Sequence, residues 1–517
     1  MCCNYNFLNM SETLLQSLPF KFFLNTLIVV YLICALTLFI YSANCYIMIF
    51  LFKKRAKKEM DKNREFLKKF AEKADKINWP VVTTQLPIFN EKNVVERLID
   101  NVVRLDYPRD KHEIQVLDDS TDDTVELVAN IVKKYQALGV NIKHIRRPNR
   151  EGFKAGALQY GMNICEGSLI AIFDADFLPE ADFLKKTVPF LIEGPEYAAS
   201  QARWGHLNAD YSWLTTAQAI GLDAHFAVEQ SARAWNGLYM NFNGTAGVWR
   251  KKAIIDAGGW QADTLTEDMD LSYRAQLAGW KMKFVFDVAA PAELPTAVTA
   301  FKSQQFRWAK GSMQTAIKLL PTIFRSKDSL LKKVEALLHL THYVVHPLIL
   351  VLAVLALPVL FFSRYMLPME AWIGLLGLFL ISTIAPSSLY LFAQRVIYDK
   401  FWKKIVFLPW MMCVGVGLAV NNSRAVVEAI LGKESPFVRT PKTGDAPQKQ
   451  KKNYFTKTNP LIWMEIIFGI YSAVGFVITV SSGRFLLGYF MLVYTIGFLF
   501  IGISSLIESR RFAMANG

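Results

Sequence analysis

Long apolar segments near both ends of the chain limit what it can fold into. The first covers residues 22–52 and contains no charged side chain. About 20 consecutive apolar residues are enough for a helix to cross a bilayer, so this segment predicts a membrane span. It is too long for the apolar core of a secretory signal peptide, and we therefore expect it to remain as an anchor.

Four later segments are also long enough to span a membrane, namely residues 337–362, 371–392, 461–480 and 485–507. Segment 405–431 is ambiguous because it begins apolar but then contains Asn421, Asn422, Arg424 and Glu428. If it crossed, the basic loop 432–459 would face the outside, whereas basic loops usually stay in the cytoplasm. We therefore expect five spans, the N-terminus outside and segment 405–431 lying in the interface, with six spans as the alternative.

The charge of the chain agrees with a membrane protein. The net charge is +14 and the mean hydropathy is +0.22. Lys and Arg gather beside the apolar segments, as in the run 53–58, where such residues set topology and contact anionic lipid. We expect membrane lipids as partners and no nucleic acid. The six cysteines form no CxxC pair, which supports neither a zinc site nor a disulfide framework.

The middle of the chain has a different periodicity. Short β-branched or apolar runs at 81–84, 114–117 and 170–173 alternate with helix-like stretches at 93–105 and 123–138. This alternation predicts an α/β domain with a mostly parallel, Rossmann-like sheet. Ligands of such sheets bind beyond the carboxyl ends of the strands, and acidic residues stand at two of these ends. They are Asp118, Asp119, Asp174 and Asp176.

These aspartates and two later motifs, at Asp268 and at Arg307-Trp308, are candidates for catalytic or ligand-binding roles. Asp174 and Asp176 can both reach a hard divalent cation, although Asp-x-Asp is also common in solvated turns. Asp268 could accept a proton from a hydroxyl, or the acidic group around it could simply favour a helix N-terminus. Arg307 offers a planar fork for a diphosphate and Trp308 a face for a sugar ring. Alternatively, these two residues belong to an interfacial helix that contacts lipid.

The order of these motifs points to a family. Asp118-Asp119, Asp174-Ala175-Asp176, Thr266-Glu267-Asp268 and Gln304…Arg307-Trp308 follow one another between two membrane regions. The chain thereby resembles the membrane-integrated family 2 glycosyltransferases of the cellulose-synthase-like kind, whose signature is D, DxD, TED and QxxRW. The resemblance covers about residues 79–458 and, with the spans, nearly the whole chain.

The resemblance implies a glycosyltransferase A-type domain that inverts the transferred sugar, with Asp268 as general base. It implies a cation, Mg²⁺ or Mn²⁺, at Asp174 and Asp176. The nucleotide-sugar-binding residues would be Asp118, Asp119, Lys154, Gln304 and Arg307. The acceptor would be bound by Trp308, Phe242, Asn243, Gly244 and Glu267. Residues 242–245 resemble a loop that reads Phe-Cys-Gly-Ser in cellulose synthases, so that cysteine is absent here. A gating loop over the nucleotide would include Phe437, Arg439, Thr440 and Lys442.

The expected domain organisation follows from the resemblance and the spans. Residues 1–52 hold the first span, 53–78 a basic linker helix, 79–300 the catalytic domain and 301–335 interfacial helices with QxxRW. Two spans lie in 336–400, an interfacial segment and the gating-like loop in 401–459, and two spans with a cytoplasmic tail in 460–517. The catalytic domain is expected to face the cytoplasm from a plasma, inner or Golgi membrane.

The predicted function is a processive hexosyltransferase that makes a β-linked polysaccharide and moves it through its own membrane channel. Details at 115–122, 154–158, 201–204, 242–250 and 293–295 resemble the mannan-synthase and xyloglucan-backbone branches, which leaves GDP-mannose and UDP-glucose open as donors. The product would be a β-glucan, mannan or glucomannan, and further partners would be a second copy of the chain or accessory export proteins. The alternatives are a transferase acting on ceramide or diacylglycerol, and a transporter whose soluble domain binds nucleotide.

Overall fold

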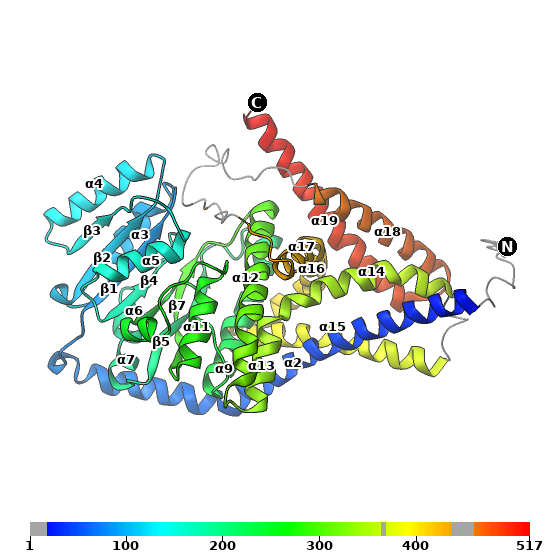
Figure 1. The fold of residues 1–517 in the computed structure, drawn as a ribbon, viewed down its shortest axis with the longest axis horizontal. Coiled ribbons are helices and arrows are strands. Elements are labelled where there is room, and N and C mark those ends of the chain that lie inside the picture. Colours follow the sequence, from blue (N-terminus) through cyan, green and yellow to red (C-terminus); the bar gives the residue numbers. More distant parts are fainter. Residues whose placement is uncertain (1–17, 363–368, 436–441, 443, 445–459, 517) are drawn as a thin grey trace.

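The computed structural model describes residues 18–362, 369–435, 442, 444 and 460–516. An α/β domain and a bundle of long helices lie side by side, and helix α2 (Leu18–Ala71) runs from one to the other (Figure 1). The predicted arrangement of an α/β domain beside apolar helices is confirmed.

A seven-stranded sheet forms the centre of the α/β domain, in the order β3-β2-β1-β4-β6-β5-β7. Strand β6 is antiparallel to β4 and β5, and the other neighbours pair in parallel. This confirms the predicted mostly parallel sheet. The strands are β1 (Val82–Ile88), β2 (His112–Asp118), β3 (Ile142–Ile145), β4 (Leu169–Ile172), β5 (Tyr197–His206), β6 (Gly247–Arg250) and β7 (Lys281–Ala292).

Helices cover both faces of this sheet, so its central strands are apolar on both sides. Alternate residues of β4 show the two layers, because Leu169 and Ala171 join one core cluster while Ile170 and Ile172 join another. The helices of the domain include α3 (Val95–Val103), α4 (Thr124–Ala137), α5 (Phe153–Ile164), α8 (Trp213–Asp223), the π-helix η3 (Ala224–Gln230) and α11 (Glu267–Leu277). Helices α3 and α4 lie where the sequence predicted helices.

Helix α2 continues without a break from the apolar segment into the basic segment that follows it. It contains 54 residues, which corresponds to about 80 Å at 1.5 Å per residue. Its first part packs against helices α14 (Val345–Phe362) and α15 (Met369–Ile397). Near its end, Phe66 packs on Phe190 and Phe70 on Trp79 of the α/β domain. The predicted domain boundary at residue 52 therefore falls inside one rigid element.

Four helical segments within the described residues are long and apolar enough to cross a membrane: Phe22–Ala71, His342–Val359, Leu461–Ser481 and Phe485–Arg511. They coincide with four of the five predicted spans. The remaining one, 371–392, lies within α15, for which part of the side chains is not described.

The ambiguous segment 405–431 forms two helices, α16 (Leu408–Gly417) and α17 (Ala419–Ile430), preceded by the short helix η6 (Phe401–Phe407). The segments before and after Leu418 are bent by 43°, which is typical of a broken span or a re-entrant loop. Helix α16 packs on α19 (Phe485–Asn516). The interfacial position of this segment stays a prediction.

Helix α12 (Val298–Arg325) connects the domain to the bundle through three acidic side chains, of which Glu465 and Glu428 are buried and Glu508 is half-buried. Glu508 of α19 accepts hydrogen bonds from the N–H groups of Val298 and Thr299, both at 2.8 Å, and thus caps α12. The Lys302 ammonium donates to Glu465 of α18 (Leu461–Ser481) at 2.8 Å. The Lys310 ammonium donates to Glu428 of α17 at 3.1 Å. Helix α12 is therefore fastened to three helices of the bundle.

The pair Lys302–Glu465 predicts a specific stability effect. Glu465→Ala leaves a buried ammonium group without its partner, and we expect this to destabilise the protein by about 3–5 kcal/mol. The double replacement Lys302→Met with Glu465→Leu should recover most of the loss, because neither charge remains buried. Thermal unfolding of the purified protein in detergent measures both effects.

The control is Lys252→Ala, which removes a lysine whose partner Asp256 lies at the surface. Exposed pairs contribute little, so this variant should unfold like the wild type. A Glu465→Ala protein as stable as the wild type would show that the pair does not fasten α12.

Candidate active site

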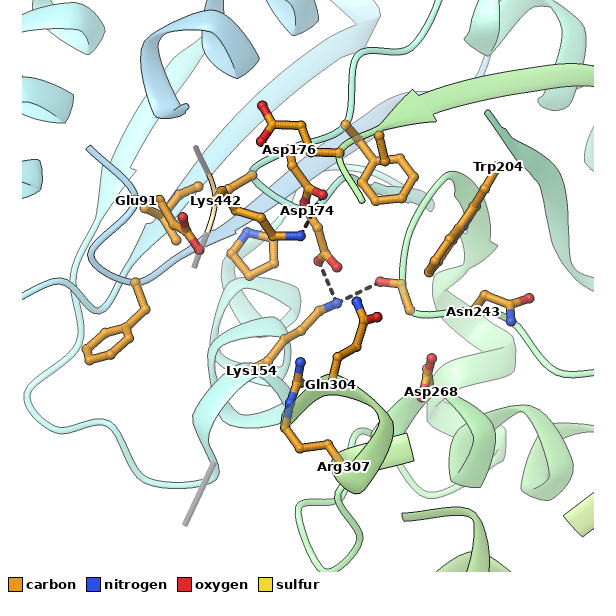
Figure 2. Close-up of a pocket in the computed structure, with 18 of the residues that line it drawn as sticks. Glu91, Lys154, Asp174, Asp176, Trp204, Asn243, Asp268, Gln304, Arg307 and Lys442 are labelled. Atoms are coloured by element: carbon orange, nitrogen blue, oxygen red, sulfur yellow. Dashed lines mark hydrogen bonds and ion pairs between the residues drawn. The ribbon is translucent and has the colours of Figure 1, made fainter. Parts of the chain in front are cut away.

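A cavity of about 210 Å³ lies at the carboxyl ends of β1, β2 and β4, and α11 and α12 line its other side. Figure 2 shows side chains from these elements converging on one space. Twelve of the predicted site residues line the cavity: Asp119, Lys154, Asp174, Asp176, Asn243, Gly244, Glu267, Asp268, Gln304, Arg307, Trp308 and Lys442. Motifs that are far apart in the sequence thus meet where an open α/β sheet binds its ligands.

Two further predicted residues, Asp118 and Phe242, are described by the structure but do not line the cavity. Asp118 is 1% exposed, hydrogen-bonds to His144 at 2.8 Å and accepts from the Ser120 N–H at 2.9 Å, so it holds the turn after β2. Phe242 is fully buried and packs on Trp249. The structure places neither side chain where it would touch a ligand in the cavity, and their binding roles stay predictions. Phe437, Arg439 and Thr440 lie outside the described residues.

The acidic pair after β4 is held by two lysines (Figure 2). The Lys154 ammonium donates to Asp174 Oδ1, and the Lys442 ammonium donates to Asp176 Oδ2, both at 2.6 Å. Lys442 belongs to the segment predicted to cover the nucleotide. Asp176 Oδ1 is buried and has no hydrogen-bond partner within the described part of the chain. No described hydrogen-bond donor occupies this carboxylate oxygen, so it is available as a ligand for a divalent cation, which prefers oxygen ligands.

Lys154 also links the acidic pair to the opposite wall of the cavity. Its ammonium donates to the Gly244 carbonyl at 2.9 Å and lies 3.9 Å from Glu267 Oε1. Burial alone would lower the pKa of Lys154, but Asp174 and Glu267 outweigh it and raise the pKa. Lys154 is therefore a fixed positive charge at the centre of an acidic site.

Asp268 lies in the first turn of α11 and faces the cavity (Figure 2). Its Oδ1 accepts a hydrogen bond from the Met269 N–H at 2.8 Å. Burial, and after it the charge of Glu267, raise the pKa of the Asp268 carboxyl to about 7, although Lys154 acts in the opposite direction. A carboxylate with a pKa near the working pH suits general-base catalysis.

Helix α12 packs closely against the turn that carries Asp268. A side chain at Gly311 would come within 2.7 Å of Thr266, so only glycine allows this approach. The Leu265 N–H donates to the Gln314 side chain at 2.9 Å. Helix α12 also presents Arg307 and Trp308 to the cavity. One helix thus positions both the general-base candidate and the residues opposite it.

Sequence reasoning gave no site role to several further residues of the cavity wall. Trp204, near the end of β5, lies with its ring centroid 6.4 Å from that of Trp308 and stacks on Phe226. Phe89 and Arg150 stack with the guanidinium carbon 3.4 Å from the ring centroid. For Trp204, the available signal was its place in the stretch 201–204, which resembles the mannan-synthase and xyloglucan-backbone branches. For the Phe89–Arg150 contact the local sequence held no signal.

Comparison with known proteins agrees with this geometry. Residues 80–311 match the family model described as "Glycosyltransferase like family 2". The chain is 35% identical over 442 residues to "Probable glucomannan 4-beta-mannosyltransferase 11" of Arabidopsis thaliana, covering 82% of this chain and 97% of that protein. The chain belongs to glycosyltransferase family 2. Within this family it is a cellulose-synthase-like hexosyltransferase, and the predictions of family, fold and enzyme class are confirmed.

Other proteins match as well. "Glucomannan 4-beta-mannosyltransferase 1" of Oryza sativa subsp. japonica is 44% identical over 264 residues, covering 50% of this chain and 51% of the relative. A solved mannosyltransferase from Pyrobaculum calidifontis, in complex with GDP-Man and Mn²⁺, aligns with a TM-score of 0.45 at 19% identity, covering 76% of this chain and 100% of that one. The curated relatives are polysaccharide synthases, which disfavours the lipid-acceptor alternative.

The close contact at Gly244 predicts how sensitive the site is. Gly244 has a φ of +77°, and a Cβ there would lie 2.9 Å from Asp268 Oδ2 and 3.3 Å from the Lys154 ammonium. We expect Gly244→Ala to displace these groups and lower the transfer rate about 100-fold, the effect of a misplacement of about 1 Å. Sugar transfer by purified protein measures it.

Gly237→Ala is the matched control, because Gly237 has a φ of +69° but open space around the added methyl group. It carries the same backbone strain and should keep its activity. Equal losses in both variants would attribute the effect to strain rather than to displacement of Asp268.

Proposed function

We propose that the protein transfers mannosyl units from GDP-mannose to the non-reducing end of a β-1,4-linked mannan or glucomannan chain. The observation that carries the proposal is that Asp174, Asp176, Asp268 and Trp308 line one cavity. The chain aligns with 97% of the length of a relative named as a probable glucomannan 4-beta-mannosyltransferase. The names of the relatives support mannose and the 4-linkage.

Asp174 and Asp176 would hold a divalent cation, Mg²⁺ or Mn²⁺. Groups of three or more metal-ligating side chains do not occur within the described residues, so donor phosphates and water would supply the other ligands. When bound, the cation would neutralise charge on the leaving diphosphate. Lys154 and Arg307 add positive charge on the same side, and the planar guanidinium of Arg307 suits phosphate oxygens.

Asp268 would accept the proton of the acceptor hydroxyl as its oxygen attacks C1 of the donor sugar. The bond between C1 and the diphosphate oxygen breaks, and GDP leaves from the opposite face. One displacement inverts the configuration at C1 and leaves the proton on Asp268. Trp308 and Trp204 provide apolar faces on which the terminal sugar of the acceptor can stack, while Asn243 and Glu267 offer it hydrogen-bonding groups.

The catalytic domain would face the cytoplasm, because the basic run 53–58 follows the first span directly. The product would leave through the helices next to Trp308, since α12 joins the cavity to the bundle. The segment that contains Lys442 would close over the nucleotide.

Product analysis tests the proposal. Purified protein given GDP-mannose and Mn²⁺ should make a polymer with 4-linked β-mannosyl residues, and chelation of the metal should stop it. UDP-glucose alone should give little product. A product that partitions into organic solvent with a single sugar, or a polymer made only from UDP-glucose, would contradict the proposal.

The role of Asp268 predicts a pH dependence. The base must be ionised, and its pKa is about 7, so kcat/KM should fall as the pH drops through neutrality, about tenfold per pH unit. Asp268→Asn should remove transfer at every pH while GDP binding, measured by calorimetry, is largely kept. A pH-independent rate on the acid side of neutrality, or loss of GDP binding in the variant, would rule out this role.

A further inference from the structure

We propose that Arg150 reads the guanine base of the donor and is thereby a specificity-determining residue of the enzyme. The inference rests on the proposed use of GDP-mannose. It states that the Arg150 side chain determines the preference for guanine over uracil nucleotides.

The sheet order places Arg150 on the side of the cavity where a base would lie. Arg150 contacts Phe89, which follows β1, and Asp119 follows β2. The acidic pair follows β4, two strands away from β2 in the order β2-β1-β4. Neighbouring strands lie about 4.8 Å apart, so the two sides are separated by about 10 Å. This separation suits a base and a diphosphate that are joined by a ribose.

The Arg150 side chain is held by aromatic rings rather than by a carboxylate. Its guanidinium lies 3.4 Å from the ring centroid of Phe89 and 5.1 Å from that of Phe153. The described residues offer it no hydrogen bond, and its Nε is buried without a partner. A buried donor without an acceptor is costly, so a ligand that supplies the acceptor gains that energy.

The neighbouring Asp119 completes the recognition surface. Arg147 binds the Asp119 carboxylate with two hydrogen bonds of 2.8 and 2.6 Å, which fixes its orientation. Each carboxylate oxygen can still accept a second hydrogen bond. Arg150 does not form this ion pair, so its N–H groups stay available to a ligand.

Guanine fits these two groups better than uracil does. Its O6 and N7 are adjacent acceptors, which a guanidinium fork binds with two hydrogen bonds. Its N1–H and N2–H groups are adjacent donors, which match the two oxygens of Asp119. Uracil offers Arg150 a single acceptor, O4, beside a carbon that accepts nothing. Arg150 should therefore contribute more to the binding of GDP than to that of UDP.

Nucleotide titration of the purified full chain with Mn²⁺, by calorimetry, tests the inference. Arg150→Ala should weaken GDP binding about tenfold or more, equivalent to about 1.4 kcal/mol, and weaken UDP binding less than about threefold. Arg150→Lys keeps the charge but not the fork, so it should also lose most of the preference for GDP. Arg109→Ala removes one exposed arginine outside the cavity and should change neither affinity.

An equal loss for GDP and UDP would assign Arg150 a general electrostatic or structural role and overturn the inference. Unchanged GDP binding, or a wild type that binds UDP more tightly than GDP, would overturn it as well. The polymer assay keeps the two proposals apart. If the wild type makes mannan and the ratio of GDP affinity to UDP affinity is the same in Arg150→Ala as in the wild type, only this inference is contradicted. If the wild type makes no polymer from GDP-mannose, the proposed function is contradicted, whatever the nucleotide titrations show.

Discussion

The polar contacts between α12 and the helix bundle are the constraint on which the geometry of the cavity depends. Glu508, Glu465 and Glu428 come from three helices of the bundle and bind successive positions of α12. Breaking a buried pair costs several kcal/mol, so α12 cannot slide or turn without losing much of the stability of a domain. Because α12 also packs against the turn of Asp268, the helix bundle sets the position of the proposed general base, which lies outside the bundle.

Inside the cavity, lysines balance the acidic side chains. Lys154 and Lys442 neutralise Asp174 and Asp176, which would otherwise repel one another and the diphosphate of a donor. The proposed cation at Asp176 would have to share or replace the contact made by Lys442. Donor binding would therefore be linked to the position of Lys442 through one carboxylate.

Local patterns predicted much of this structure. Strands β1, β2 and β4 and the apolar helices have periodicities that depend only on neighbouring residues, and the strand ends located the acidic motifs. The sequence could not tell which of two adjacent aspartates faces the cavity. Successive side chains of a strand end point to opposite sides, so Asp118 turns to His144 and Asp119 to Arg147. The contact of Arg150 with Phe89 joins segments 61 positions apart and depends on how they pack.

The continuity of α2 has a consequence for how such a chain can vary. Its first part packs on α14 and α15, and Phe66 and Phe70 near its end pack on the α/β domain. An α-helix turns by about 100° per residue, so one residue inserted between these contacts would swing one contact face away from its partner. The rotation about the helix axis between the two contact faces of α2 is thus fixed, as is the distance between them. Only insertions of nearly whole helical turns would keep both faces in contact with their partners. Both the length of α2 and the relative orientation of its two contact faces are therefore constrained.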